Sequence, residues 1–380
     1  MNQHQTLRHH LALAQVEGIG GTLHRLLVHH FKEPALVWKA KPHQWRQIYG
    51  IGDTISLQLK REAFWLEQAD RILDAADKQQ VQIASYQCVS YPNRLGQIPD
   101  APAIIYWKGD LHGTASKTIA VVGTRKSTEY GKRWVQSWMP SLAAHHPVVI
   151  SGLALGIDTL AHQSALKHHL PTLAVMANGL DMVYPAHNKK LAQQIIEQGG
   201  GLVSENPLGM KPMASLFIAR NRIIAGLSDV CVLVESAIRG GGMVTADFAF
   251  QYDRAVMAVP GSLWSPQSEG PHALIKQQKA QILTDLEDIW AEVAWPKEVV
   301  QGHLFQPTAL STKNEFRMDL LTAIEKNIVQ VLKEKGEVQI DQLAFDTQLS
   351  LNQLASTLLQ LEFQGILTIK PGKKVRLTLS

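Results

Sequence analysis

The chain has 380 residues, a formal net charge of +4, and 45% hydrophobic and 18% charged residues. This length exceeds what one compact core usually organises, no apolar run is long enough to cross a bilayer, and the polar, His-rich start lacks a signal-peptide profile. We therefore expect two or three globular domains in the cytoplasm, with a mildly basic charge that permits a polyanionic partner without demanding one.

The first 75 residues are expected to be helical, and they contain a faint repeat in which Gly18-Ile19-Gly20 recurs as Gly50-Ile51-Gly52. Each copy follows a helix-like segment. The pair resembles helix-hairpin-helix units, whose glycines let backbone amides approach a DNA phosphate. A tight turn between packed helices explains the glycines equally well, because glycine is the usual residue after a helix. Both interpretations stay open at this point.

Between about residues 117 and 290, short apolar runs alternate with helical stretches. The runs lie at 119–122, 148–151, 172–177, 201–203, 230–234 and 255–259. Segments that are apolar on both faces and alternate with helices are typical of a parallel sheet covered on both sides. We predict a doubly wound α/β domain whose ligand site lies where loops leave the carboxyl ends of the strands.

The C-terminal part follows a stretch of little periodicity, 295–315, which contains Pro296 and Pro307 and is interpreted as a linker. Beyond it, the order of a helix, a short strand, two helices and two strands predicts a winged helix. Its expected recognition helix, from Leu351 to Gln364, contains no Lys or Arg, so base-specific reading of a duplex is not expected. Cations near the wing leave contact with a nucleic-acid backbone and contact with a protein both open.

Four turns that follow predicted strands carry small residues. The first, Gly123-Thr124-Arg125-Lys126, offers a glycine, a hydroxyl and cations at a helix start, which suits an anion but lacks the G-x-G-x-x-G pattern of dinucleotide sites. The other three are Ser151-Gly152, Gly179-Leu180-Asp181 with the nearby aromatic Tyr184, and Gly240-Gly241-Gly242. Singly these turns are weak evidence, but together they predict one anion-binding crevice.

The segment 220–227 is the most informative part of the chain. Arg220 and Arg222 flank Asn221, and Phe217 lies one turn upstream, which is equipment for holding phosphates and stacking a base. Positions i and i+2 of a helix diverge by about 200°, so the two arginines cannot hold one phosphate. Either they grip successive phosphates, or one binds the ligand while the other pairs with an acid such as Glu235.

Signs of catalysis or of a metal are weak. Asp158 and His162 share a helical face at i, i+4, but no nucleophile or third partner accompanies them, and a structural pair is commoner than an acid-base pair. The histidine doublets lack metal-ligand spacing, and the two cysteines, Cys88 and Cys231, lie far apart. We therefore expect no metal, no cofactor and reduced thiols.

The motifs together resemble the DNA processing protein A family (DprA, also called Smf). The resemblance rests on Gly123 to Arg125, Ser151 to Asp158, Gly179 to Pro185, Arg220 to Leu227 and Pro260-Gly261, and it spans nearly the whole chain. It implies a SAM-like or helix-hairpin-helix domain at 1–75, an extended Rossmann-like, doubly wound parallel sheet at 76–294, and a winged-helix domain at 316–380. It also implies a cytoplasmic homodimer, not regarded as an enzyme, that binds and protects single-stranded DNA in natural transformation and loads the RecA recombinase onto it.

Residue by residue, the resemblance assigns DNA binding to the predicted crevice and assigns no catalytic or metal-binding residue. The DNA-binding residues that it implies are Gly123, Thr124, Arg125, Lys126, Ser151, Gly152, Ala154, Gly156, Phe217, Arg220, Asn221, Arg222, Gly240, Gly241, Gly242 and Thr245. The sequence departs from the family at Ala219, where an arginine is frequent, and at Gly241, where a serine is frequent. The rival hypothesis is a Rossmann-like hydrolase of free nucleotides that uses Asp158 and Glu235, although the glutamate beside a Pro-Gly-Gly turn that is usual in such enzymes is missing.

Overall fold

The computed structural model describes residues 3–111, 117–293, 295, 322–363, 366–370 and 374–377. The chain forms two compact units, 1–299 and 300–380, each of which is described by itself. The linker predicted at 295–315 lies, apart from Trp295, outside the described residues. None of the described helices combines the length and the apolar character that a membrane span requires.

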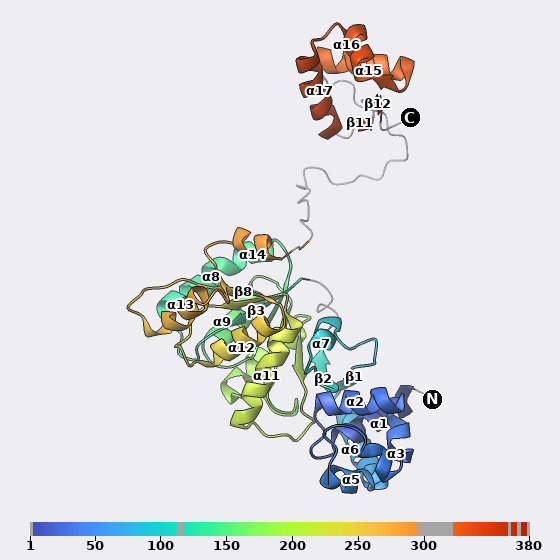
Figure 1. The fold of residues 1–380 in the computed structure, drawn as a ribbon. Helices are drawn as coiled ribbons and strands as arrows, with labels where there is room; N and C mark the ends of the chain where they lie inside the picture. The colour runs from blue at the N-terminus through green and yellow to red at the C-terminus, as the bar shows by residue number, and fades with distance from the viewer. Residues whose placement is uncertain are drawn as a thin grey trace. The chain divides into compact units, whose positions relative to one another are not determined.

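One sheet of nine strands organises the first unit (Figure 1). Its order is β1-β2-β6-β5-β4-β3-β7-β8-β9. Strands β3 to β9 are parallel to one another, while β1 and β2 are added at one edge by antiparallel pairing. The strands are β1 (Gln82–Ser85), β2 (Ile104–Gly109), β3 (Thr118–Val122), β4 (Val148–Ser151), β5 (Thr172–Val175), β6 (Gly201–Ser204), β7 (Val230–Leu233), β8 (Ala255–Ala258) and β9 (Gln281–Ile282). The six predicted strands are confirmed as β3 to β8.

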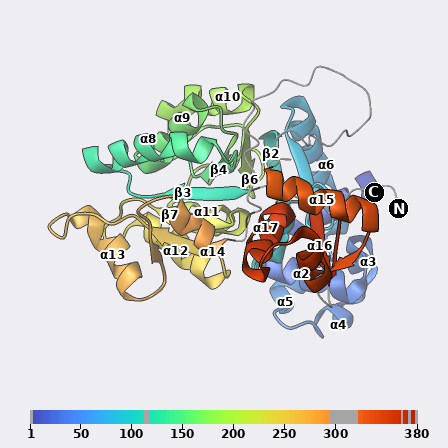
Figure 2. The ribbon, with the colours of Figure 1, turned by 90° about the horizontal axis from the view of Figure 1, so that it is seen from above.

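Helices cover both faces of this sheet, as Figure 2 shows for α8 and α9 on one side and α11 and α12 on the other. Ile119 and Val121 of β3 pack in the cluster with α8, whereas Ala120 and Val122 pack in the cluster with α11 and α12, as the alternation of a strand requires. The doubly wound α/β prediction is therefore confirmed. The helices are α7 (Asn93–Gln97), α8 (Glu129–Ala143), α9 (Ile157–Lys167), α10 (Lys189–Glu197), α11 (Ala214–Leu227), α12 (Gly241–Gln251), α13 (Glu269–Lys276) and α14 (Glu287–Glu292), with short 3-10 turns η2 (Ala186–Asn188) and η3 (Pro266–Ser268).

Before β1 the described residues form six helices, and both glycine repeats lie in turns between them. Gly18 and Gly50 have φ values of +88° and +93°, which favour glycine, while Gly20 and Gly52 are the N-caps of α2 and α5. The repeat is thus a repeat of backbone geometry, and its contact with DNA stays a prediction. The helices are α1 (Gln3–Ala14), α2 (Gly21–Phe31), α3 (Pro34–Lys39), α4 (Pro42–Trp45), α5 (Asp53–Leu59) and α6 (Glu62–Lys78).

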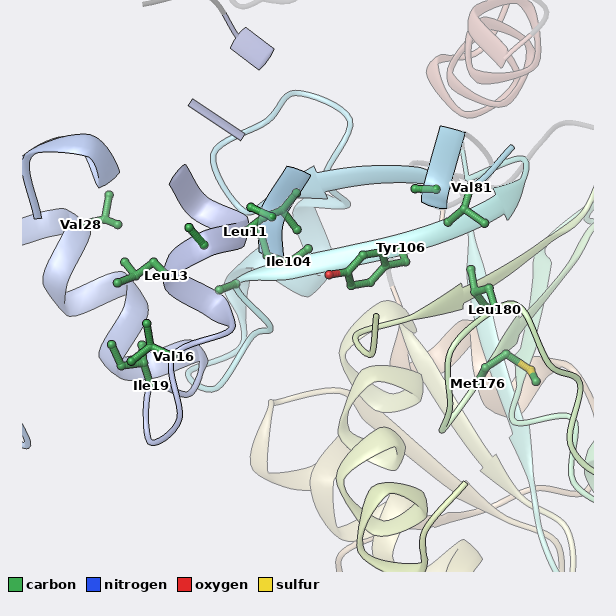
Figure 3. Close-up of a cluster of buried hydrophobic side chains, with 14 of the residues drawn as sticks. Leu11, Leu13, Val16, Ile19, Val28, Val81, Ile104, Tyr106, Met176 and Leu180 are labelled. Atoms are coloured by element: carbon green, nitrogen blue, oxygen red, sulfur yellow. The ribbon is translucent and has the colours of Figure 1, made fainter. Parts of the chain in front are cut away.

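The N-terminal helices share their core with the sheet. Leu13 of α1 and Val28 of α2 belong to the same buried cluster as Tyr106 of β2 and Met176 after β5 (Figure 3). The boundary predicted between residues 75 and 76 falls inside the last turn of α6, and one continuous apolar cluster crosses it. The division into two domains at this boundary stays a prediction.

A pair of histidines lies buried between α1 and α2. Nδ1 of His10 is 2.9 Å from Nε2 of His24, and Nε2 of His10 is 3.0 Å from Oε1 of Gln87 after β1. Burial lowers the pKa of His10 to about 4 and that of His24 well below its usual value. Both imidazoles are therefore neutral in the folded protein at neutral pH.

The second unit is a winged helix, as predicted. It consists of α15 (Ala323–Lys335), β10 (Val338–Gln339), α16 (Ile340–Thr347), α17 (Leu351–Phe363), β11 (Leu367–Lys370) and β12 (Lys374–Leu377), and its sheet has the order β10-β12-β11. Leu332, Leu343 and Leu358 contribute to a buried core of its own. The turn predicted at Pro371-Gly372 lies outside the described residues.

Candidate nucleic-acid interface

A pocket of about 570 Å³ lies where several parallel strands end. Strands β5, β4, β3 and β7 are neighbours, so the loops that follow them meet at the carboxyl edge of the sheet, as predicted. Helix α11 and the first turn of α12 complete the wall. The pocket is lined by Val122, Gly123, Thr124, Arg125, Ala154, Asp158, Tyr184, Pro212, Met213, Ala214, Phe217, Ile218, Arg220, Asn221, Ile224, Ala237, Gly240, Gly241, Gly242, Val244, Thr245 and Gln267.

Glycines let α12 approach the loop after β3. A Cβ atom at Gly242 would lie 3.1 Å from Cα of Gly123 and 2.7 Å from Cδ1 of Leu233, so a side chain there would push the helix away. Gly240 is the N-cap of α12, and a Cβ atom at Gly241 would have no neighbour within 4 Å. The first turn of α12 is therefore open to the pocket, and its unpaired backbone N–H groups suit an anion.

An exposed cation and two aromatic rings gather at the pocket mouth. The guanidinium carbon of Arg125 is 5.2 Å from the ring centroid of Phe217, and the ring of Tyr184 is 5.6 Å from the same ring. Arg125 is exposed and Tyr184 is 44% exposed, so both can meet a ligand. Cations with aromatic faces are the combination that binds a phosphate chain and stacks its bases.

Arg220 lines the same pocket but is only 4% exposed. Its Nη1 donates to the carbonyl oxygen of Gly152 at 2.6 Å and to that of Val175. Burial lowers the pKa of Arg220 to about 10, an effect that the carboxylate of Asp158 opposes. Its hydrogen bonds thus join α11 to the loop after β4 and to the end of β5, and a contact with DNA stays a prediction.

Arg222 does not line the pocket and has an anchoring role instead. Its Nη2 is 2.5 Å from Oε2 of Glu205, and its Nε is 3.4 Å from Oδ2 of Asp100. The alternative in which one arginine pairs with an acid therefore holds for Arg222, but the suggested partner, Glu235, is wrong. Glu235 accepts instead from the backbone N–H of Thr128 at 2.9 Å and from its hydroxyl.

Four further residues of the predicted set do not line the pocket. Ser151 is buried and its hydroxyl donates to the carbonyl oxygen of Val121 at 2.7 Å. A Cβ atom at Gly152 would lie 2.4 Å from Nη1 of Arg220, and one at Gly156, where φ is +81°, would lie 2.2 Å from the carbonyl oxygen of Thr124. These three residues allow the loops to pack closely behind the pocket wall, while Lys126 is exposed beside it.

The proposed acid-base pair is not formed. Nδ1 of the buried His162 is 2.7 Å from Oγ1 of Thr172, and burial lowers the pKa of this imidazole to about 3. Asp158, 7% exposed, accepts from the N–H of Ala154 at 3.4 Å, and burial raises its pKa although Arg220 opposes the shift. The carboxylate pair of the rival hypothesis is not assembled either, because Glu235 does not line the pocket.

Several lining residues have no counterpart in the sequence patterns. Met213 and Ile218, at the start of α11, are half exposed, and Gln267 comes from the loop after β8. The first half of α11 is exposed or half-buried, and no sequence pattern indicated that Met213 and Ile218 line a pocket. No pattern indicates Gln267, whose loop is joined to the β7 loop by a hydrogen bond from the N–H of Ser236 to its carbonyl oxygen at 2.7 Å.

Metal-binding groups are sparse as far as the structure describes the chain. Within the described ranges, no three His, Cys, Asp or Glu side chains are placed to share a metal ion. Cys88 and Cys231 are free cysteines, and burial raises the pKa of Cys231 to about 12. Neither cysteine lines the pocket.

The whole arrangement matches one known family. The family model described as DNA recombination-mediator protein A matches residues 82–294, and that of the DprA winged helix domain matches residues 318–373. This chain belongs to the DNA processing protein A family. Protein Smf of Escherichia coli is 36% identical over 319 residues, which cover 82% of this chain and 79% of that protein. Protein Smf of Synechocystis is 31% identical and is matched over 96% of this chain and 97% of its own length.

Solved structures of the family agree with the fold. The X-ray structure of DprA from Streptococcus pneumoniae gives a TM-score of 0.62 at 32% identity, covering 74% of this chain and 95% of that one. DprA of Helicobacter pylori, whose structure describes its unique single-stranded DNA binding mode, gives a TM-score of 0.50 at 29% identity over 55% of this chain and 94% of that one. The family resemblance inferred from the motifs is therefore confirmed.

Proposed function

We propose that this DprA family member binds single-stranded DNA without sequence preference in the pocket at the carboxyl edge of its sheet. The observation that carries this proposal is the juxtaposition of Arg125, Phe217 and Tyr184 with the open first turn of α12. A cation and backbone amides hold phosphates, and rings stack on bases, but neither distinguishes one base from another. The single-stranded DNA bound by the H. pylori relative supports the same ligand class.

Within this proposal the two pocket arginines differ. Arg125 is exposed and contacts the phosphate chain. Arg220 instead holds the loop after β4 against the end of β5 and lowers the repulsion that Asp158 would exert on an anion. Mobility-shift titrations with matched single-stranded and duplex oligonucleotides test the ligand class. We expect tighter binding of the single strand, and equal affinity for both forms would contradict the proposal.

The residue-level test uses Arg125→Ala, with Arg71→Ala as the matched control. Arg71 is an exposed arginine on α6 that pairs with Glu67 at 2.6 Å and does not line the pocket. A charge-assisted hydrogen bond is worth about 1.5–3 kcal/mol, so Arg125→Ala should weaken DNA binding by at least tenfold while Arg71→Ala leaves it unchanged. An equal loss in both variants would indicate a non-specific charge effect.

We also propose that the protein acts as a homodimer in the cytoplasm, protects incoming DNA during natural transformation and loads RecA onto it. Family membership supports this role, and a pocket without an assembled acid-base pair supports binding without turnover. Nuclease-protection assays and RecA filament assembly on single-stranded DNA test the two activities, and sedimentation tests the dimer. A deletion strain with normal transformation frequency would refute the biological role.

A hydrolase of free nucleotides is the second candidate. The pocket volume of about 570 Å³ suits one small ligand, and Asp158 lines it. Incubation with nucleoside monophosphates, followed by a search for released base, tests this activity. Turnover that disappears in Asp158→Asn would establish the hydrolase, and no turnover above background would exclude it for these substrates.

A further inference from the structure

Trp264 and Leu263 are exceptionally exposed apolar side chains, at 93% and 83% exposed. They lie in the loop between β8 and α13. Exposing two adjacent large apolar side chains to water is energetically unfavourable, and such exposure commonly marks a binding surface. The indole of Trp264 is hardly packed against the rest of the protein, so contact with a ligand explains its presence better than a role in the fold.

The loop that carries Trp264 is held at several points. The hydroxyl of Tyr130 donates to the carbonyl oxygen of Pro260, and the N–H of Ser265 donates to that of Ser262 at 3.0 Å. At its other end, the carbonyl oxygen of Gln267 accepts from the N–H of Ser236 at 2.7 Å. Trp264 is therefore presented on an ordered loop, which limits the entropy lost when its ring stacks on a ligand.

Trp264 and Tyr184 follow strands at opposite ends of a row. Tyr184 follows β5 and Trp264 follows β8, and the strand order between them is β5-β4-β3-β7-β8. Four strand spacings amount to about 19 Å, which is the length of roughly five or six nucleotides at the 3.4 Å spacing of a stacked strand. The pocket extends along this row from Tyr184, which lines it, to Gln267, which lies three residues after Trp264.

Exposed cations lie on the loops between the two aromatic ends. Lys126 belongs to the loop after β3 and Arg239 to the loop after β7, and both side chains are exposed. In the order of its strands, the carboxyl edge thus presents the pocket with Tyr184 at one side, then two further exposed cations, and then a second aromatic ring outside the pocket. Proteins that bind single-stranded nucleic acid combine cations, which contact the phosphates, with aromatic rings, on which the bases stack.

We propose that a single strand leaving the pocket crosses the loops after β7 and β8 and stacks a base on Trp264. This inference rests on the proposed function and adds a contact outside the pocket. Stacking on an indole face is sequence-tolerant because every base has a π-face, and it requires an unpaired base, so Trp264 adds to the preference for single strands.

The test compares Trp264→Ala and Trp264→Phe with wild type by fluorescence anisotropy on oligodeoxythymidines of about four and about twenty nucleotides, lengths that bracket a short site. For the long oligonucleotide we expect Trp264→Ala to weaken binding roughly tenfold and Trp264→Phe to restore most of the affinity. For the short one, which fills only the pocket, neither variant should change binding. Phe345→Ala is the matched control, because Phe345 is an aromatic side chain that is 80% exposed on α16 of the second unit.

Each other result overturns the inference. If the long oligonucleotide binds Trp264→Ala as tightly as wild type, Trp264 is not a DNA contact. The proposed function would still stand in that case, provided that wild type binds the oligonucleotide and Arg125→Ala loses this binding. Equal weakening at both lengths would show that Trp264 acts through the pocket. A change in sedimentation of the DNA-free variant would assign the surface to contact between copies of the chain. Failure of wild type to bind either length would refute the proposed function itself.

Discussion

Replacing Arg220 and Arg125 separately should distinguish a residue that holds the pocket together from one that holds DNA. Arg220→Ala removes the donor to the carbonyl oxygens of Gly152 and Val175 and leaves Asp158 buried without its nearby positive charge. Leaving a buried polar group without its partner costs about 1–3 kcal/mol, and two carbonyl groups lose their donor here, so we expect a loss of about 3–5 kcal/mol of unfolding free energy. An exposed residue such as Arg125 should cost within about 0.5 kcal/mol.

These free energies predict separable thermal transitions. A loss of 1 kcal/mol lowers Tm by roughly 2–4 °C in a domain of 150–250 residues. Arg220→Ala should therefore melt about 10 °C below wild type, whereas Arg125→Ala should melt at the same temperature as wild type. Gly152→Ala provides a second route to the same contact, because its Cβ atom would lie 2.4 Å from Nη1 of Arg220 and would displace the guanidinium without removing the charge. We expect its Tm to fall as well.

Calorimetry gives the stabilities, and DNA affinity is then measured at a temperature where every variant is folded. The expected pattern is a lowered Tm for Arg220→Ala and Gly152→Ala, and a lowered affinity with unchanged Tm for Arg125→Ala. If Arg220→Ala melted like wild type but lost DNA binding, the guanidinium would be a ligand contact and its structural role would be refuted.

Three further predictions address the anchor, the phosphate contacts and the histidine pair. Arg222→Ala should lower the urea midpoint by leaving Glu205 unpaired, at a cost of about 3 kcal/mol, and DNA affinity of the folded variant should stay unchanged. The logarithm of the binding constant should fall linearly with the logarithm of salt concentration, and Arg125→Ala should flatten that slope by about 0.7, the value for one single-strand phosphate contact. Burial lowers the pKa of His10 to about 4 and also lowers the pKa of His24. As pH falls below about 6.5, these histidines therefore take up protons in the unfolded chain before they do so in the folded protein. The free energy of unfolding should drop by roughly 3 kcal/mol from His10 alone by pH 4. Urea unfolding between pH 7 and pH 4.5 measures the loss, and a variant with both histidines replaced by Gln should lose less.

The predictable part of the fold is the part buried on both faces. Strands β3 to β8 are mostly apolar and alternate with helices, so their runs stand out in the sequence, whereas β9 has two residues that are both exposed and β1 begins with the polar Gln82. Strand β2 was not predicted although its first four residues are apolar and buried, because it lies before the region in which such runs alternate with helices. The glycine turns at Gly123 and Gly240 were predictable because close backbone approach restricts the residue type at those positions.

The partners of the two arginines were not predictable. Arg220 donates to carbonyl groups 68 and 45 residues away, and backbone carbonyls carry no sequence signal. Arg222 pairs with Glu205 from the end of β6, one of several acids that the helix could have met. The motif therefore identified the pocket wall, while the direction of each guanidinium depended on packing.

The shared apolar cluster between the N-terminal helices and the sheet has a consequence for how separable the parts of this chain are. Leu13, Val28 and their neighbours shield Tyr106 and Ile104 on the antiparallel edge of the sheet. Excising the helices would expose a hydrophobic strip beside strand edges, which invites self-association. The helical region thus covers this edge of the sheet permanently, and an exchange of segments between relatives would have to carry both parts together.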